Sequence, residues 1–402
     1  MLKLAYIRGM KHWKKYLDRH QAYHKYAIPD KFNYGMVVVI PCYDEPRLLT
    51  TLNSLLHCLP TQNPVGVVVV VNSSELTDSE IVQKNRETYQ AVKLFANKHN
   101  QPNMAFHALL CENMPRKHAG VGLARKIGME WAVRGFLQSG NKDGVIISLD
   151  ADCTVSENYL QLIEHQFATY SPNCCVMNFR HRVVEDSPGL QGAIEQYEKY
   201  IWYFRDALKT IDFPFYYHTI GSAFAVLADA YVKTGGIGRQ QGGEDFYFLQ
   251  KVFFLGRTTE LMKAYVYPEA RFSDRIPFGT GPALEKILAT DDGVLRVYSV
   301  EAFQALKAFF ILRIKFYKKP VEVITSLIGQ LHVSVQDFLK ENNSLEAIND
   351  CNENSATALT FEKRFFHHFD AFFIIKYLNF AHNNYFELAP IDTAKDKLDA
   401  LL

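Results

Sequence analysis

Asp150 and Asp152 follow an apolar segment, "GVIISLDAD" (144–152), and only Ala151 separates them. Residues two apart at the end of a strand point to the same side. Two carboxylates in this arrangement suit Mg²⁺ or Mn²⁺, which take few protein ligands and complete their shell with water and phosphate oxygens. The alternative is a helix N-cap, from an Asp or from Thr154, for a helix beginning near Ser156. A cap does not need both carboxylates, so the pair predicts a metal site for a phosphorylated ligand.

A second acidic pair, Glu244 and Asp245, follows the glycine-rich stretch "GGIGRQQGG" (235–243). Acids in the first turn of a helix are favoured by the helix dipole, so the pair has a structural explanation. A glycine-rich loop before the pair is also typical of segments that grip substrates. Asp245 in such a loop is a candidate general base for a sugar hydroxyl, with Glu244 as its alternative.

Three further segments carry candidate ligands for a nucleotide diphosphate. "KHAGVGLARK" (117–126) offers backbone donors near Gly122 and a cation at Arg125, although it lacks the dinucleotide-binding fingerprint and also reads as a plain helix entry. "PEARFSDRIPFGTGPAL" (268–284) is either a loop that closes over a diphosphate through Arg271 and Arg275 or a salt-bridged surface loop. The third segment, "PCYDEP" (41–46), lies at the end of the first apolar run. A similar polar segment, "NSSE" (72–75), follows the second apolar run.

The elements that must position these residues alternate along the chain. Apolar runs at 36–41, 65–71, 105–111 and 144–150 predict buried strands, and segments with helical periodicity lie between them. This pattern predicts an α/β fold with a mostly parallel sheet and helices on both faces. Ligands of such sheets bind at the carboxyl ends of the strands, where the strand order reverses.

The two ends of the chain differ from this central part. Residues 1–34 hold eight Lys/Arg against Asp18 and Asp30, with apolar residues at helical spacing, and predict a basic amphipathic helix. That helix either packs on the main domain or contacts an anionic membrane surface. From about residue 290 the chain predicts long helices rich in Phe and Tyr around a polar, loop-like stretch at 341–358. We therefore expect an N-terminal helix (1–34), a catalytic domain (35–289) and a helical C-terminal region (290–402).

The aromatic segment 361–386 places Phe and Tyr residues at spacings of three and four, which predicts an apolar stripe along one helical face. Such a stripe usually packs in a core. A membrane-surface or dimer contact is the alternative, and it would suit a lipid-linked acceptor.

Four segments together resemble the family 2 glycosyltransferases, which have the glycosyltransferase A-type fold. These segments are "VVVIPCYDEPRLLTTLNSLL", "GVGLARKIGMEWA", "IISLDADCTVSENYL" and "GGEDFYFLQKV", and the resemblance covers about residues 35–256. It implies an inverting transferase that uses a nucleotide-diphosphate sugar and a divalent metal, Mn²⁺ or Mg²⁺. Asp150 would lie near the ribose, Asp152 would hold the metal on the diphosphate, and Asp245 would be the base. The residues that match the family's nucleotide-binding loop are Pro41, Tyr43 and Glu45.

The chain departs from the family pattern in two places. Many members carry an aspartate after the second strand that reads the base, and Asn72 or Ser73 stands there in this chain. The Gln-x-x-Arg-Trp motif of processive synthases is absent, as are their transmembrane helices, which favours single additions. The alternatives are a sugar-phosphate nucleotidyltransferase, which should carry a Gly-rich basic loop after the first strand, and a catalytically silent binding or scaffold member.

Composition limits the remaining functions. The chain has 402 residues, 48% of them hydrophobic and 22% charged, as in a folded globular protein. A formal net charge of +1 argues against nucleic-acid binding through bulk charge. Seven cysteines without Cys-x-x-Cys spacing predict reduced thiols. No apolar stretch approaches the roughly 18–20 residues needed to span a bilayer, and the N-terminus does not read as a signal peptide, so we expect a soluble cytoplasmic protein, peripheral at the inner membrane face if the terminal helices touch lipid.

Overall fold

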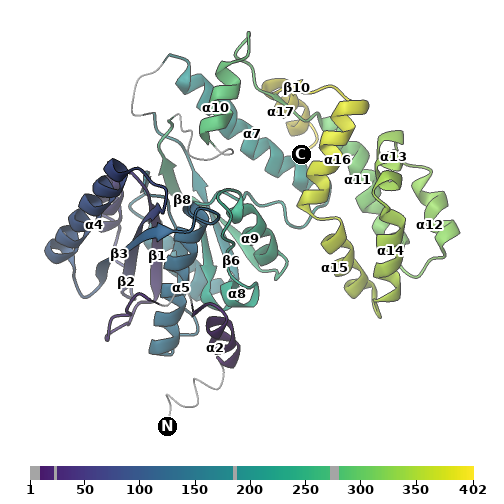
Figure 1. The fold of residues 1–402 in the computed structure, drawn as a ribbon. Coiled ribbons are helices and arrows are strands. Elements are labelled where there is room, and N and C mark those ends of the chain that lie inside the picture. Colours follow the sequence, from purple (N-terminus) through teal and green to yellow (C-terminus); the bar gives the residue numbers. More distant parts are fainter. Residues whose placement is uncertain (1–9, 22–24, 184–187, 272–279) are drawn as a thin grey trace. The chain divides into compact units, whose positions relative to one another are not determined.

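The computed structural model describes residues 10–21, 25–183, 188–271 and 280–402 (Figure 1). The chain forms two compact units: unit 1 contains Met1–Asp186 and Thr219–Pro282, and unit 2 contains Ser187–His218 and Ala283–Leu402. The sequence pattern predicts that residues 187–218 belong to the 35–289 domain. In the structure these residues belong with the C-terminal helices instead.

Unit 1 is built on an eight-stranded sheet with the order β3-β2-β1-β4-β7-β6-β8-β5. Strands β3, β2, β1 and β4 run parallel to one another, and β6 runs parallel to β8, whereas β7 is antiparallel to both β4 and β6 and β5 is antiparallel to β8. The four predicted strands correspond to β1–β4, which confirms the predicted mostly parallel α/β class. The bounds are β1 Met36–Cys42, β2 Val65–Ser74, β3 Met104–Met114, β4 Val145–Ser148, β5 Cys153–Val155, β6 Cys174–Phe179, β7 Phe224–Leu227 and β8 Thr258–Pro268.

Helices cover both faces of this sheet because its central strands are apolar on both sides; every residue of β1 is buried. Helices α3 (Leu48–Leu56), α4 (Ser79–His99) and α6 (Tyr159–Tyr170) share one core with β1 and β2. Helix α5 (Val121–Ser139) crosses the other face, where Gly128 permits close contact: a Cβ there would lie 2.4 Å from Val39 Cγ1. The site-bearing N-terminus of α5 is thereby fixed to the sheet.

Three further helices complete the described part of unit 1. Helix α2 (Lys11–Asp18) packs against α8 (Ala228–Lys233) and α5, and α9 (Glu244–Phe253) begins at the predicted acidic pair. The basic N-terminal helix is therefore present, and within unit 1 it packs on the main sheet domain.

Unit 2 is helical, with a short two-stranded sheet of β9 (Arg296–Val297) and β10 (Ala389–Pro390). The helices entirely within it are α7 Leu190–Thr210, α11 Val300–Leu312, α12 Val321–Ile328, α13 Val333–Glu341, α14 Ser344–Glu353, α15 Ala358–His368, α16 Ala371–Asn384 and α17 Ile391–Asp399. Helix α10 (Thr280–Leu288) lies where the chain passes from unit 1 to unit 2. Among the described residues, no helix in either unit is long and apolar enough to cross a bilayer.

Two expectations for this region are wrong in detail. The polar stretch 341–358, predicted as a loop, contains α14. Few residues of this helix are apolar, and among them Ile348 and Cys351 are buried. The aromatic segment 361–386 is two helices, because the chain breaks at Phe369 and Asp370 caps α16 by accepting from Phe373 N at 2.9 Å.

Most of the aromatic stripe is core, as the packing alternative predicted. Phe365 and Phe369 are buried, and the Phe309 ring lies 5.4 Å and 5.1 Å from them between centroids. Phe372 and Tyr385 are exceptions, with 43% and 37% of their surfaces exposed. The stripe therefore stabilises unit 2 and leaves little apolar surface for a membrane.

Candidate functional site at the strand ends

The candidate site lies at the switch point between β1 and β4. These strands are parallel neighbours, with Val39 opposite Ser148, while β2 and β3 continue on the other side of β1. The loops that leave β1 and β4 thus begin side by side at their carboxyl ends. Thr51 of α3 fixes the second loop by donating to Ala151 O at 2.7 Å. We call this region, together with the start of α5, the start of α9 and Arg271, the strand-end site.

Arg125 is the centre of the site. Its side chain is 3% exposed, and its Nη2 lies 2.6 Å from Asp150 Oδ1. Its Nη1 donates to Glu244, which is 2% exposed. Burial alone would lower the pKa of Arg125, but Asp150, Glu244 and Asp245 outweigh it and raise that pKa. Arg125, predicted from the sequence as a diphosphate ligand, therefore joins the two predicted acidic motifs.

Two glycines allow these elements to meet. A Cβ on Gly122 would lie 2.2 Å from Gln240 O, so the first turn of α5 can approach the glycine-rich loop only with Gly at this position. A Cβ on Gly221 would lie 2.7 Å from Asp245 Oδ2 and 3.1 Å from Arg125 Nη2. Gly221, in the loop before β7, was missed by the sequence analysis, and nothing in "TIGSAF" (219–224) signals its role.

Asp245 sits in the first turn of α9, which begins after Gly243 in a left-handed conformation (φ 73°). Its Oδ1 accepts from Phe246 N at 2.8 Å. Burial raises the pKa of Asp245, although Arg125 acts in the opposite direction. Burial likewise raises the pKa of Glu244 against the effect of Arg125. A carboxylate with a raised pKa is a better proton acceptor near neutral pH.

Arg271 makes a second ionic contact across the site. Its Nη2 lies 3.1 Å from Asp152 Oδ2 and also bonds the buried Glu45. Burial, followed by the charge of Asp150, raises the pKa of Asp152 to about 6, while Arg271 lowers it. Arg271 and Glu45, both predicted as ligands, are therefore close to the predicted metal ligand. Arg275 lies outside the described residues.

The predicted nucleotide loop is held by side-chain amides. Asn72 is buried, and its Nδ2 donates to Cys42 O at 2.8 Å, which ties the ends of β1 and β2 together. Asn85 of α4, which the sequence analysis did not single out, donates to Asn72 O at 3.0 Å and accepts from Asp44 N at 2.9 Å. Tyr43 follows β1 as a half-buried residue. Pro41 lies within β1, opposite Val70, and is buried.

The donor set for a divalent cation is small. Among the described residues, no group of three or more His, Cys, Asp or Glu is placed to hold a metal. Asp150 and Asp152 have side chains 36% and 25% exposed, and each has one oxygen within reach of an arginine. Asp152 Oδ1 accepts the weak thiol bond of Cys153. Two reachable carboxylates in an acidic site fit a hard cation that takes its other ligands from phosphate and water.

Comparisons with known proteins give distant structural likeness. No protein-family model and no curated protein matches the chain. The structure of S. aureus TarS 1-349 in complex with UDP-GlcNAc is 15% identical, at a TM-score of 0.42, over 83% of this chain and 91% of that one. GalNAc-T7 with UDP, GalNAc and Mn2+ is 13% identical, at a TM-score of 0.37, over 75% of this chain and 55% of that one. Both TM-scores lie below 0.5, and the proposal below rests on the residues of this chain.

Proposed function

We propose that the strand-end site binds a nucleotide-diphosphate sugar with a divalent cation and transfers the sugar, with inversion, to an acceptor hydroxyl. The observation that carries this proposal is the convergence of five carboxylates with two guanidinium groups at the switch point of the sheet. The carboxylates are Glu45, Asp150, Asp152, Glu244 and Asp245, and the guanidinium groups are those of Arg125 and Arg271. This excess of negative charge favours a bound cation and disfavours a bare anion.

Asp152, assisted by Asp150, would hold the Mn²⁺ or Mg²⁺. Such a cation stabilises negative charge on a departing diphosphate. Asp150 would also contact the ribose, and Pro41, Tyr43 and Glu45 would form the nucleotide pocket, as the family resemblance implies. Asn72 would complete this pocket at the position where many members carry an aspartate. Backbone N–H groups near Gly122 at the start of α5 would donate hydrogen bonds to the diphosphate.

Asp245 would act on the acceptor. Its Oδ1 is engaged with the backbone, which leaves Oδ2 to take the proton of a sugar hydroxyl. The hydroxyl oxygen then forms a bond to the anomeric carbon as the bond to the diphosphate breaks, and the diphosphate leaves with the electron pair. Attack on the face opposite the leaving group inverts the anomeric centre. Arg125 keeps Glu244 and Asp150 in position through this step.

A panel of sugar nucleotides tests the proposal. Purified full-length protein is heated with each donor, with Mn²⁺ and with EDTA, and hydrolysis is then measured for donors that raise the melting temperature. We expect at least one donor to stabilise the protein only with Mn²⁺ and to be hydrolysed slowly. A panel without any metal-dependent shift would contradict the proposed function, and a shift without turnover would favour the silent scaffold alternative.

A further inference from the structure

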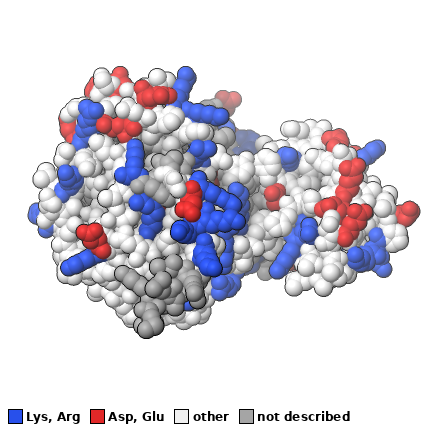
Figure 2. Space-filling model, turned by 60° about the horizontal axis from the view of Figure 1, so that its bottom comes forward, with Lys and Arg blue, Asp and Glu red and all other residues white. Residues whose placement is uncertain are grey.

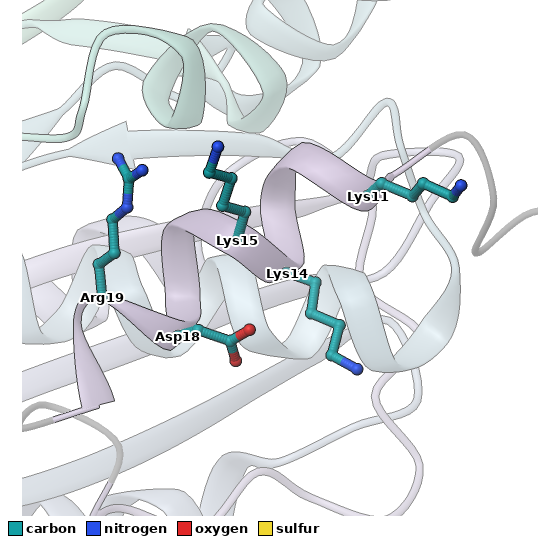
Figure 3. Close-up of a pocket in the computed structure, with 5 residues that line it drawn as sticks. All are labelled: Lys11, Lys14, Lys15, Asp18 and Arg19. Atoms are coloured by element: carbon teal, nitrogen blue, oxygen red, sulfur yellow. The ribbon is translucent and has the colours of Figure 1, made fainter.

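Helix α2 presents four cations to solvent. Lys11, Lys14, Lys15 and Arg19 are all exposed, and they line a surface pocket together with Asp18 (Figure 3). In Figure 3, Lys15 and Arg19 extend in the same direction from the helix. We call these four residues the α2 basic face. In Figure 2, basic side chains gather in the middle of the side that carries α2.

The opposite side of α2 is fixed to unit 1. Trp13, Tyr16 and Leu17 are buried, and Trp13 Nε1 donates to Asp229 Oδ1 at 2.9 Å. Tyr16 also donates to Glu130 inside the unit. Because the apolar residues are used in this packing, α2 has no apolar side left to insert into a bilayer, and its cations have a fixed arrangement.

The α2 basic face keeps a surplus of positive charge in the described part of the chain, with the carboxylate of Asp18 among its four cations. None of its four cations forms an ion pair there, whereas lysines on other surface helices do: Lys84 lies 2.7 Å from Glu80, and Lys397 lies 2.7 Å from Glu301. Lys11, Lys15 and Arg19 are spaced four residues apart, an arrangement in which like charges destabilise a helix by several tenths of a kcal/mol. An external anionic surface would relieve this repulsion.

We propose that the α2 basic face docks unit 1 on an anionic lipid bilayer by electrostatic attraction, without insertion. The row from Lys11 to Arg19 extends over roughly 12 Å of helix, which matches a surface with many headgroups rather than a single small anion. Single-stranded nucleic acid would need exposed aromatic rings for stacking, and the α2 rings are buried. The proposal does not depend on the proposed transferase function.

Vesicle co-sedimentation of the full chain tests this surface. Phosphatidylcholine vesicles with and without 30% phosphatidylserine are compared at 0.1 M and 0.5 M NaCl, using wild type and K11Q/K14Q/K15Q/R19Q. The matched control, K84Q/K93Q/K98Q/K142Q, removes the same charge from exposed lysines elsewhere in unit 1. Melting temperatures verify that both variants fold, and the α2 variant should melt no lower than wild type because its repulsion is relieved.

We expect wild type and control to bind phosphatidylserine vesicles at low salt and to be released at high salt. The α2 variant should partition at least about tenfold less, since each cation near such a surface contributes about fivefold. Equal binding of the α2 variant and the control would overturn the proposal. The proposal would also be overturned if wild type bound neither type of vesicle at low salt.

Discussion

Two neighbouring residues of α5 carry buried positive charge, and their surroundings differ. Arg125 faces the strand ends, where its partner Asp150 is 36% exposed and more carboxylates lie nearby. Lys126 faces α2, where it lies 3.2 Å from Glu130, whose side chain is completely buried. Tyr16 and Tyr231 donate to the same carboxylate, and Lys126 Nζ donates to Ile237 O at 3.2 Å.

The difference lies in charge balance. In the Lys126 cluster, Lys126 and Glu130 form a buried ion pair that aromatic hydroxyls close, as expected of a structural contact. Among the described residues, the strand-end site has more carboxylates than cations and keeps part of its acidic surface accessible. Buried ion pairing alone therefore does not indicate function, and the proposal for the strand-end site rests on its surplus of one charge at a switch point.

The largest expected effect is on the transfer rate, and it should distinguish Asp245 of the strand-end site from Glu130 of the Lys126 cluster. Asp245→Asn keeps the shape of the side chain but removes the proton acceptor, so transfer should fall by about 10²–10⁴ while donor binding persists. Glu130→Gln, its matched control in the structural cluster, should retain the wild-type rate per folded molecule. Transfer assays with the donor found by thermal shift give both rates. Near wild-type turnover in the Asp245 variant would move the base to another residue, with Glu244 the next to replace.

Replacing the buried cation of each cluster should lower the free energy of unfolding by different amounts. Arg125→Met leaves Asp150 and Glu244 without their partner and should lower the free energy of unfolding by about 3–5 kcal/mol. The double change Lys126→Met with Glu130→Gln removes both charges but keeps an acceptor for the Tyr16 and Tyr231 hydroxyls, and it should cost less, about 1–2 kcal/mol. Urea unfolding followed by circular dichroism measures both. Equal losses in the two variants would mean that the clusters do not differ in charge balance.

A smaller effect should depend on pH. The pKa of Asp152 is raised from 3.8 to about 6, so its ionisation costs the folded state stability as pH rises between these values, and the cost persists above pH 6. Asp152→Asn should therefore match wild type near pH 4 and exceed it by about 1–3 kcal/mol at pH 7 in metal-free buffer. Unfolding curves at the two pH values provide the check. A constant difference between them would show that ionisation of Asp152 is not penalised.

The sheet and the acidic loops could be predicted because they depend on local pattern. Continuous Val and Ile runs specify buried strands, and parallel topology brings the ends of β1 and β4 together whatever the intervening helices contain. The pairs at Asp150–Asp152 and Glu244–Asp245 were evident for the same reason.

Contacts between distant segments could not be predicted in this way. Arg125 meets Glu244 across 119 residues of sequence, and Gly221 touches this cluster only through the folded chain. The helix α14 was hidden because most of its residues are polar and its stability depends on packing of a few apolar side chains. The assignment of residues 187–218 to unit 2 depends likewise on tertiary packing.

The measurement that tests the central claim most directly is metal-dependent nucleotide binding by Asp152→Ala. Calorimetric titration of the nucleoside diphosphate of the selected donor is carried out with Mn²⁺ and with EDTA, on wild type, Asp152→Ala and Glu130→Gln. We predict that Mn²⁺ strengthens binding to wild type and to Glu130→Gln, and that this gain disappears in Asp152→Ala while the variant still unfolds cooperatively. Unchanged Mn²⁺-dependent affinity in Asp152→Ala would contradict a metal and nucleotide site at the ends of β1 and β4.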